Sequence, residues 1–170
     1  MTPPPPLVDA LESSVHKQFD IERLIACFNI DVQSHVIKKN SRPIYRRGAK
    51  VFLGKSKELV NAEKAMTLNL RSQANIQGLK EPIKGPLWVI MHFYFPRERF
   101  FTKQKQISRI LPDLTNLMQL PEDCLVEAGI IEDDSQIHSV DLSRRLPSHE
   151  YRLEIFLLKY QDSSLLFERP

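Results

Sequence analysis

The run GPLWVIMHFYFP at residues 85–96 constrains the fold of this chain more than any other stretch. It is rich in β-branched and aromatic residues and has proline near both ends, a pattern typical of a strand. A helical pattern precedes it, with Ser56 as a favourable N-cap and Gly78 as the stop. The apolar residues near one face of this helix are Leu59, Ala62, Met66, Leu70 and Ala74.

A second helix is predicted to begin at Pro112 and to end at Gly129. Pro121 lies inside it and should kink the helix or mark a break. Strands are predicted at residues 27–32 and 51–53, and an antiparallel hairpin from the runs 136–146 and 151–160. Together these patterns predict an α+β domain: a small mixed sheet, two main helices and a C-terminal antiparallel strand pair. The apolar stripe of the second helix consists of Leu114, Leu117, Met118, Leu125 and Ala128.

The composition is that of a soluble globular protein with one domain, because the 170 residues are 42% hydrophobic and 26% charged. The longest apolar runs are far shorter than the roughly 20 residues of a membrane span. The N-terminus lacks the basic end and apolar core of a secretory signal. Cys27 and Cys124 are isolated, which argues against thiol-ligated zinc and favours reduced packing residues in a cytoplasmic protein. Residues 1–26 form a proline-rich leader and a short predicted helix without an assigned role.

Charge is strongly segregated along the chain, although the net charge is only +3. Residues 38–57 contain eight bases and no acid, whereas residues 111–143 contain eight acids and no lysine or arginine. Apolar residues run through both blocks, so both are predicted to be folded segments. The basic block fits nucleic acid, but a solvated surface or an acidic protein partner remains an alternative.

The acids predict a metal site. Asp113 lies at the start of the second helix, and Asp133 and Asp134 lie in the loop beyond its end. The ends of a straight helix of this length are about 22 Å apart, so convergence needs a bend or a strand that returns the loop. Converging carboxylates repel one another unless a cation binds, and oxygen ligands suit Mg²⁺ or Mn²⁺. A metal ion held by aspartates in a basic protein indicates phosphodiester chemistry, because the metal activates water and the basic side chains hold the polyanion.

Two simpler interpretations stand beside the metal site. Acids near a helix N-terminus suit the helix dipole, and an acidic loop is commonly just solvated. His138, close to the acids in sequence, fits an ordinary strand residue as well as a ligand.

The acidic segments carry a resemblance to a known family. PDLTNL at 112–117, the helix after it and DDSQ at 133–136 are similar to the Asp-x-Asp-Asn-Leu, helix and Asp-Asp-x-Gln signature of the RusA-type Holliday-junction resolvases. KKNS at 38–41 resembles the segment that precedes the first helix of that family. The resemblance covers residues 27–160 and leaves a tail at 161–170.

The resemblance implies a RusA-like fold and a homodimer that binds four-way (Holliday) DNA junctions and cuts them with Mg²⁺, in recombination and repair. It assigns metal binding to Asp113 and Asp134, and Asp133 is a further candidate ligand because it lies in the same acidic loop. The third aspartate of the family falls on Thr115 and its lysine on Gln119, so these two catalytic positions depart from the pattern. The implied DNA-binding residues are Lys38, Lys39, Asn40, Arg42, Arg46, Arg47, Lys50, Lys103, Lys105, Arg109 and Asn116.

The departures leave more than one function open. Thr115 can offer only a neutral oxygen, and Gln119 supplies no positive charge, although Lys103, Lys105 or Arg109 could substitute for the missing cation. The first hypothesis is a structure-selective endodeoxyribonuclease. The alternatives are a junction-binding protein of the same fold with reduced or lost cleavage, and a protein-interaction adaptor, against which the basic block argues.

Overall fold

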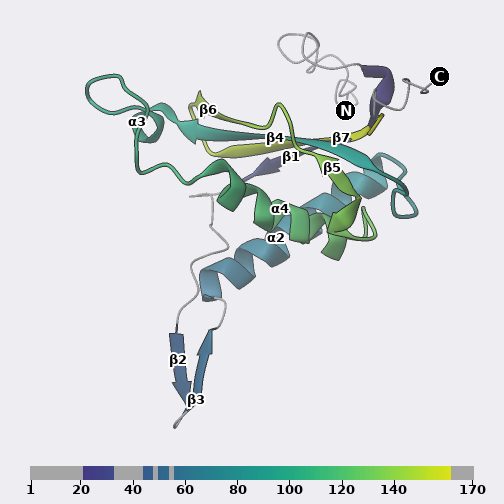
Figure 1. The fold of residues 1–170 in the computed structure, drawn as a ribbon, viewed down its shortest axis with the longest axis horizontal. Coiled ribbons are helices and arrows are strands. Elements are labelled where there is room, and N and C mark those ends of the chain that lie inside the picture. Colours follow the sequence, from purple (N-terminus) through teal and green to yellow (C-terminus); the bar gives the residue numbers. More distant parts are fainter. Residues whose placement is uncertain (1–20, 33–43, 48–49, 54–55, 162–170) are drawn as a thin grey trace, which may run out of the picture.

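The computed structural model describes residues 21–32, 44–47, 50–53 and 56–161. A mixed sheet is covered on one face by two helices (Figure 1). After a short 3-10 turn at Ile21–Arg23, the elements in chain order are β1 (Leu24–Asp31), β2 (Ile44–Arg47), β3 (Lys50–Leu53), α2 (Lys57–Ile76), β4 (Leu87–Pro96), α3 (Arg97–Phe100), α4 (Leu114–Glu127), the 3-10 turn η2 (Asp134–Gln136), β5 (Ile137–Ser139), β6 (Arg144–Ser148) and β7 (Arg152–Lys159).

The sheet has the order β1-β7-β4, with β5 and β6 paired one after the other along the far side of β4. β7 is antiparallel to both β1 and β4, whereas β5 and β6 run parallel to β4. The predicted α+β class with a small mixed sheet and two main helices is therefore confirmed.

The predicted C-terminal hairpin is wrong in its pairing, because β4 lies between β6 and β7. Eight of the ten residues of β4 are buried, so this strand gains most by lying inside the sheet. β6 contains Arg144, Arg145 and Pro147, none of which is buried, and it fits an edge position because proline cannot donate to a ladder.

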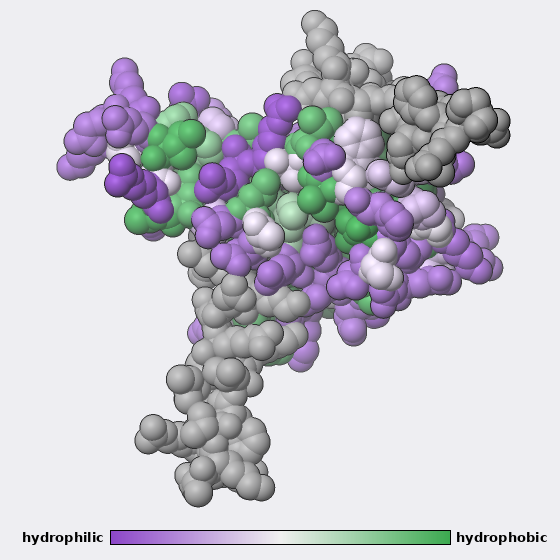
Figure 2. Space-filling model, viewed as in Figure 1, coloured by the Kyte–Doolittle hydropathy of each residue, from purple (hydrophilic) through white to green (hydrophobic). Residues whose placement is uncertain are grey.

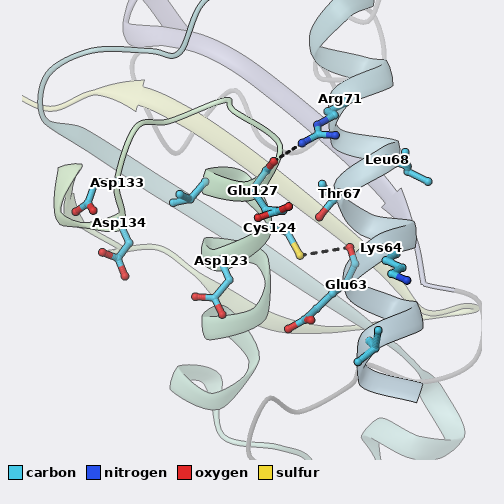
Figure 3. A pocket seen from close by; sticks show the side chains of 12 residues that line it. Glu63, Lys64, Thr67, Leu68, Arg71, Asp123, Cys124, Glu127, Asp133 and Asp134 are labelled. Atoms are coloured by element: carbon cyan, nitrogen blue, oxygen red, sulfur yellow. Dashed lines mark hydrogen bonds between the residues drawn. The ribbon is translucent and has the colours of Figure 1, made fainter. Parts of the chain in front are cut away.

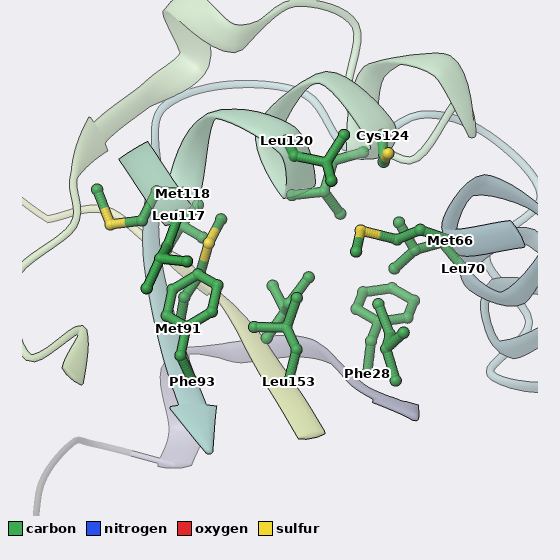
Figure 4. Packing of buried hydrophobic residues seen from close by; sticks show 14 of the residues in the cluster. Phe28, Met66, Leu70, Met91, Phe93, Leu117, Met118, Leu120, Cys124 and Leu153 are labelled. Carbon is green, nitrogen blue, oxygen red and sulfur yellow. The ribbon is translucent and has the colours of Figure 1, made fainter. Parts of the chain in front are cut away.

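The main core lies between the helices and one face of the sheet (Figure 4). On α2, Leu59, Met66, Leu70 and Ala74 are buried as predicted, and Ser56 accepts a hydrogen bond from the Leu59 backbone N–H at 3.2 Å. Leu117, Met118 and Leu125 of α4 are buried as well, next to Met91 and Phe93 of β4. Burying each such side chain stabilises the fold by about 1.5–3 kcal/mol.

Both predicted glycine stops are confirmed. Gly78 and Gly129 adopt φ values of +77° and +72°, a left-handed conformation that glycine reaches at little cost. Pro121 does not break α4, which continues through it to Glu127. Proline removes one helical hydrogen bond, but the Pro121 ring is buried among core residues, and this burial offsets part of the loss.

Two glutamines, Gln73 of α2 and the C-cap residue Gln77, cover part of the free edge of β1. The Gln77 side chain accepts from the Cys27 N–H at 3.1 Å and donates to the Cys27 carbonyl at 2.7 Å. Gln73 does the same at Asn29, with distances of 3.0 and 2.6 Å. These side chains thus take the place of a neighbouring strand at Cys27 and Asn29, and they occupy backbone groups that could otherwise pair with another chain.

The predicted short strand at 51–53 is part of β3, which pairs with β2 in register from Ile44–Leu53 to Arg47–Lys50. Figure 1 shows this hairpin extending away from the sheet, beyond the N-terminal end of α2. Cys27 and Cys124 are buried free thiols, as predicted. The helix predicted within residues 7–26 lies outside the described residues as far as residue 20. Residues 21–23 form a 3-10 turn and residues 24–26 begin β1, so the prediction is wrong at this end. None of the described helices is long and apolar enough to span a bilayer.

A group of ionisable residues lies on the sheet face away from the helices. The Tyr94 hydroxyl donates to Glu154 Oε2 at 2.7 Å, Arg152 Nη2 is 3.2 Å from Glu154 Oε1, and His92 Nδ1 is 3.8 Å from Glu154 Oε2. Burial, reinforced by the Glu154 carboxylate, raises the pKa of Tyr94 to about 12. Burial alone would raise the pKa of Glu154, but His92, Tyr94 and Arg152 outweigh it and lower that pKa.

Candidate active site and nucleic-acid interface

Asp113 occupies the N-cap of α4 without capping it. Its side chain makes no capping hydrogen bond and is exposed, so its carboxylate faces solvent. Arg145 of β6 donates from Nη1 to the carbonyl of Pro112 at 3.1 Å. This bond ties the residue before Asp113 to the sheet. It also places a cation beside the start of α4, which the sequence alone did not indicate.

The loop after α4 holds its two aspartates in different ways. Asp133 caps η2, and its Oδ1 accepts from the Ser135 N–H at 2.9 Å. Hydrogen bonds from the hydroxyl and the N–H of Ser135 lower the pKa of Asp133. Its carboxylate is therefore engaged by its own turn. Both aspartates are exposed and line a hollow beside α4, but Asp134 does not cap the turn. Of the two, Asp134 is better placed to bind a ligand.

Gln136 fastens this loop to the segment before β4. Its Oε1 accepts from the backbone N–H groups of Glu132 and Asp133 at 2.7 and 3.2 Å. Its Nε2 donates to the carbonyls of Ile83 and Gly85 at 3.0 and 3.1 Å. The sequence motif that ends at Gln136 thus has a physical basis, because this side chain fixes where Asp134 lies.

Asp113 and Asp134 lie at opposite ends of α4. The helix has 14 residues, which corresponds to about 21 Å. The sheet agrees: Ile137 pairs at Leu87 and Arg145 pairs at Phe93, and six residues of strand span about 20 Å. Across the described residues, no group of three His, Cys, Asp or Glu side chains could hold a metal ion. The structure therefore does not bring these two aspartates together within one chain.

A groove of about 730 Å³ lies between α2 and α4, next to Asp133 and Asp134 (Figure 3). Figure 3 shows Asp123 on α4 between these aspartates and Glu63 on α2. Five carboxylates and two bases line the groove, so its net charge is negative. The charged lining residues are Glu63, Asp123, Glu127, Asp133, Asp134, Lys64 and Arg71. Arg71 donates to the backbone carbonyls of Glu127 and Ala128, which ties α2 to the end of α4.

A polar stripe on α4 connects the two acidic ends. Thr115, Gln119 and Asp123 follow one another at intervals of four and share one helical face. This stripe leads from Asp113 to the groove that contains Asp134. Asp123 is the functional candidate that the sequence analysis missed, and its four-residue spacing from Gln119 was the signal that could have revealed it.

The predicted DNA-binding residues fall into three groups. Lys38, Lys39, Asn40 and Arg42 lie outside the described residues. Arg46 and Arg47 belong to β2, and Lys50 begins β3. Lys103, Lys105 and Arg109 are exposed on the loop between α3 and α4, and Asn116 is half-buried in the first turn of α4. This loop leads directly into Asp113. His138 is exposed in β5, and its ring lies against the Tyr160 ring with centroids 5.4 Å apart and a tilt of 37°.

Comparison with known proteins gives a family match that covers both acidic segments. The family model of the endodeoxyribonuclease RusA matches residues 36–157, well over half of the chain. The match includes both acidic segments and the two elements β2 and β3. No curated protein gives a significant match to the chain. Because a single family model covers well over half of the chain, including β4, both helices and both ends of the candidate site, the chain belongs to the RusA endodeoxyribonuclease family.

Proposed function

We propose that this nuclease resolves four-way DNA junctions as a homodimer, with Mg²⁺ as its cofactor and Mn²⁺ as a possible substitute. The observation that carries the proposal is the family match over residues 36–157, which spans both acidic segments. The exposed bases between α3 and α4 support it, because phosphate contacts from lysine and arginine supply much of the affinity for DNA.

Asp113 and Asp134 would hold the metal, since exposed carboxylate oxygens are the ligands that Mg²⁺ prefers. A bound Mg²⁺ supplies Lewis-acid chemistry and neutralises charge at a phosphodiester. The residues of the chain contribute position and charge. Gln136 holds the Asp134 loop, and Arg145 holds the start of α4 beside Asp113. Asp123 adds a further carboxylate next to Asp134.

The separation of Asp113 from Asp134 along α4 gives the proposed homodimer a specific role. One ion that joins both aspartates requires Asp113 of one copy and Asp134 of the partner subunit. Two-fold symmetry would then create two equivalent composite sites, which suits an enzyme that makes two symmetric cuts. Separate ions at the two ends of α4 would need no partner residue.

Mixing two inactive variants tests this arrangement. Asp113→Asn and Asp134→Asn should each bind a labelled synthetic junction but not cut it, whereas Glu81→Gln, at an exposed acid that does not line the groove, should cut like the parent. After equimolar mixing and subunit exchange, half of the dimers are mixed and contain one intact composite site. Nicking should therefore recover to about a quarter of the parental rate. If nicking does not recover although mixed dimers form, the aspartates of each chain act without the partner.

Thr115 and Gln119 favour the second candidate function, a junction-binding protein with reduced or lost cleavage. Binding and cutting must therefore be scored separately, on a four-way junction and on a linear duplex of the same sequence, with and without Mg²⁺. Selective binding with Mg²⁺-dependent cutting supports the nuclease. Selective binding without cutting supports the second candidate, and equal binding to both DNAs contradicts junction selectivity.

A further inference from the structure

Residues 97–111 form a projection at one end of the sheet (Figure 1). After α3, the chain makes a tight hairpin in which Phe101 and Ile107 form an antiparallel bridge. Thr102 N–H donates to the Gln106 carbonyl at 2.8 Å, and Ser108 N–H donates to the Phe100 carbonyl at 2.8 Å. These bonds give the loop a defined shape.

Two buried side chains anchor the projection to the domain. Phe100 and Leu111 are 6% and 8% exposed and belong to the main core. The Phe100 ring packs edge-on against Phe101 with centroids 4.9 Å apart, and the Arg97 guanidinium lies over the Phe101 ring at 5.8 Å. The segment between the two anchors is therefore held outward from the domain.

The surface of the projection combines exposed isoleucines with a high density of positive charge. Ile107 and Ile110 are 58% and 75% exposed, two of the four large exposed hydrophobic side chains among the described residues. The projection contains five bases and one acid: Arg97, Arg99, Lys103, Lys105 and Arg109, with Glu98. Figure 2 shows hydrophobic surface between hydrophilic groups on this projection, at the left of the view.

We propose that Ile107 and Ile110 form an apolar wedge that contacts unstacked bases at the branch point of a DNA junction. This inference rests on the proposed function and deepens it. Proteins that open base steps insert apolar side chains such as isoleucine between bases, and adjacent cations bind the flanking phosphates. The wedge leads through Leu111 and Pro112 into Asp113, so base opening would take place beside the acidic end of α4.

The basic side chains around the two isoleucines argue against a protein partner for this surface. An apolar patch that docks a protein is depleted of charged residues at its centre. Here Arg109 lies between the two isoleucines in sequence, and Lys103 and Lys105 stand at the hairpin tip. DNA at an open branch point offers both phosphate charges and the apolar faces of unstacked bases, so it can contact the lysines and arginine as well as the isoleucines.

A fluorescent adenine analogue placed at the branch point tests the wedge. Its emission rises when the base unstacks, and anisotropy of a distal label reports binding in the same sample, without divalent metal so that no strand is cut. The parent should bind and raise the emission. Ile107→Ser with Ile110→Ser should bind with a similar salt dependence but lose most of the rise. Ile76→Ser, at an isoleucine of α2 that is 78% exposed, is the matched control and should behave like the parent.

The complementary variant Lys103→Gln with Lys105→Gln should weaken binding and lower the log–log salt slope by about 0.9 for each phosphate that the protein no longer neutralises. A parental complex without any rise in emission overturns the wedge and leaves the proposed function standing. A rise that persists in the double isoleucine variant also overturns it. Conversion of that variant from dimer to monomer would assign the isoleucines to a protein interface instead. Failure of the parent to bind the junction would contradict the proposed function itself.

Discussion

Gln136 provides the sharpest test of how the structure positions Asp134. Gln136→Ala removes four hydrogen bonds: two accepted from the N–H groups of Glu132 and Asp133, and two donated to the carbonyls of Ile83 and Gly85. The substitution leaves the carboxylate of Asp134 in place. It removes only the side chain that ties its loop to the segment before β4.

The expected cost follows from the number of bonds and their exposure. A hydrogen bond contributes about 0.5–1.5 kcal/mol net, and those near solvent belong at the lower end because water replaces the missing partner. Three of the four bonds of Gln136 are solvent-exposed. The free energy of unfolding should therefore fall by about 2–3 kcal/mol, which lowers the melting temperature of a chain of this size by roughly 4–12 °C.

Urea titration and a junction-cutting assay at a temperature well below melting measure the two effects separately. Gln136→Ala should lower the urea midpoint, and the folded variant should cut more slowly while its DNA affinity changes little. Asn61→Ala, at an exposed position of α2, is the control and should change neither quantity. Gln136→Glu adds a pH test. The new carboxylate repels the two backbone carbonyls to which Gln136 donates, and this repulsion ends when acid protonates the carboxylate. An unchanged midpoint and cutting rate in Gln136→Ala would refute the reasoning.

Three further predictions follow from the fold and the site. Gln73→Leu with Gln77→Leu should expose the edge of β1 and increase self-association with concentration, measured by light scattering. A variant that scatters like the parent would show that the two glutamines do not protect this edge. Because the pKa of Tyr94 is raised from 10.0 to about 12, its contribution to stability is complete below pH 10 and is lost as pH rises toward 12. Alkaline unfolding of Tyr94→Phe should therefore lack this loss, and equal pH profiles would contradict it. Thr115→Asp with Gln119→Lys should speed cutting about tenfold or more without tightening binding, since each restores charge at the site; slower cutting would mean that the natural residues are already balanced.

The sequence alone determined the features that depend on a few neighbouring residues. The apolar run at 85–96, the Ser56 cap and the glycine stops each act over one turn or one strand, so they were identified correctly. The same is true of the positions of Asp113 and Asp134 at the two ends of a helix. These are local properties because backbone conformation and side-chain periodicity are set within about ten residues.

Only the tertiary structure decided which segments meet. β7 pairs with β1 and β4 rather than with β6, because the most apolar strand belongs inside the sheet. Gln136 reaches Ile83 across 53 positions of sequence, and Gln77 reaches Cys27 across 50. Whether two carboxylates converge depends on the paths of α4 and of the loop that follows it, which place Asp113 at the start of the helix and Asp134 beside Asp123. Such contacts gain free energy only when the whole core is assembled, and no local pattern encodes them.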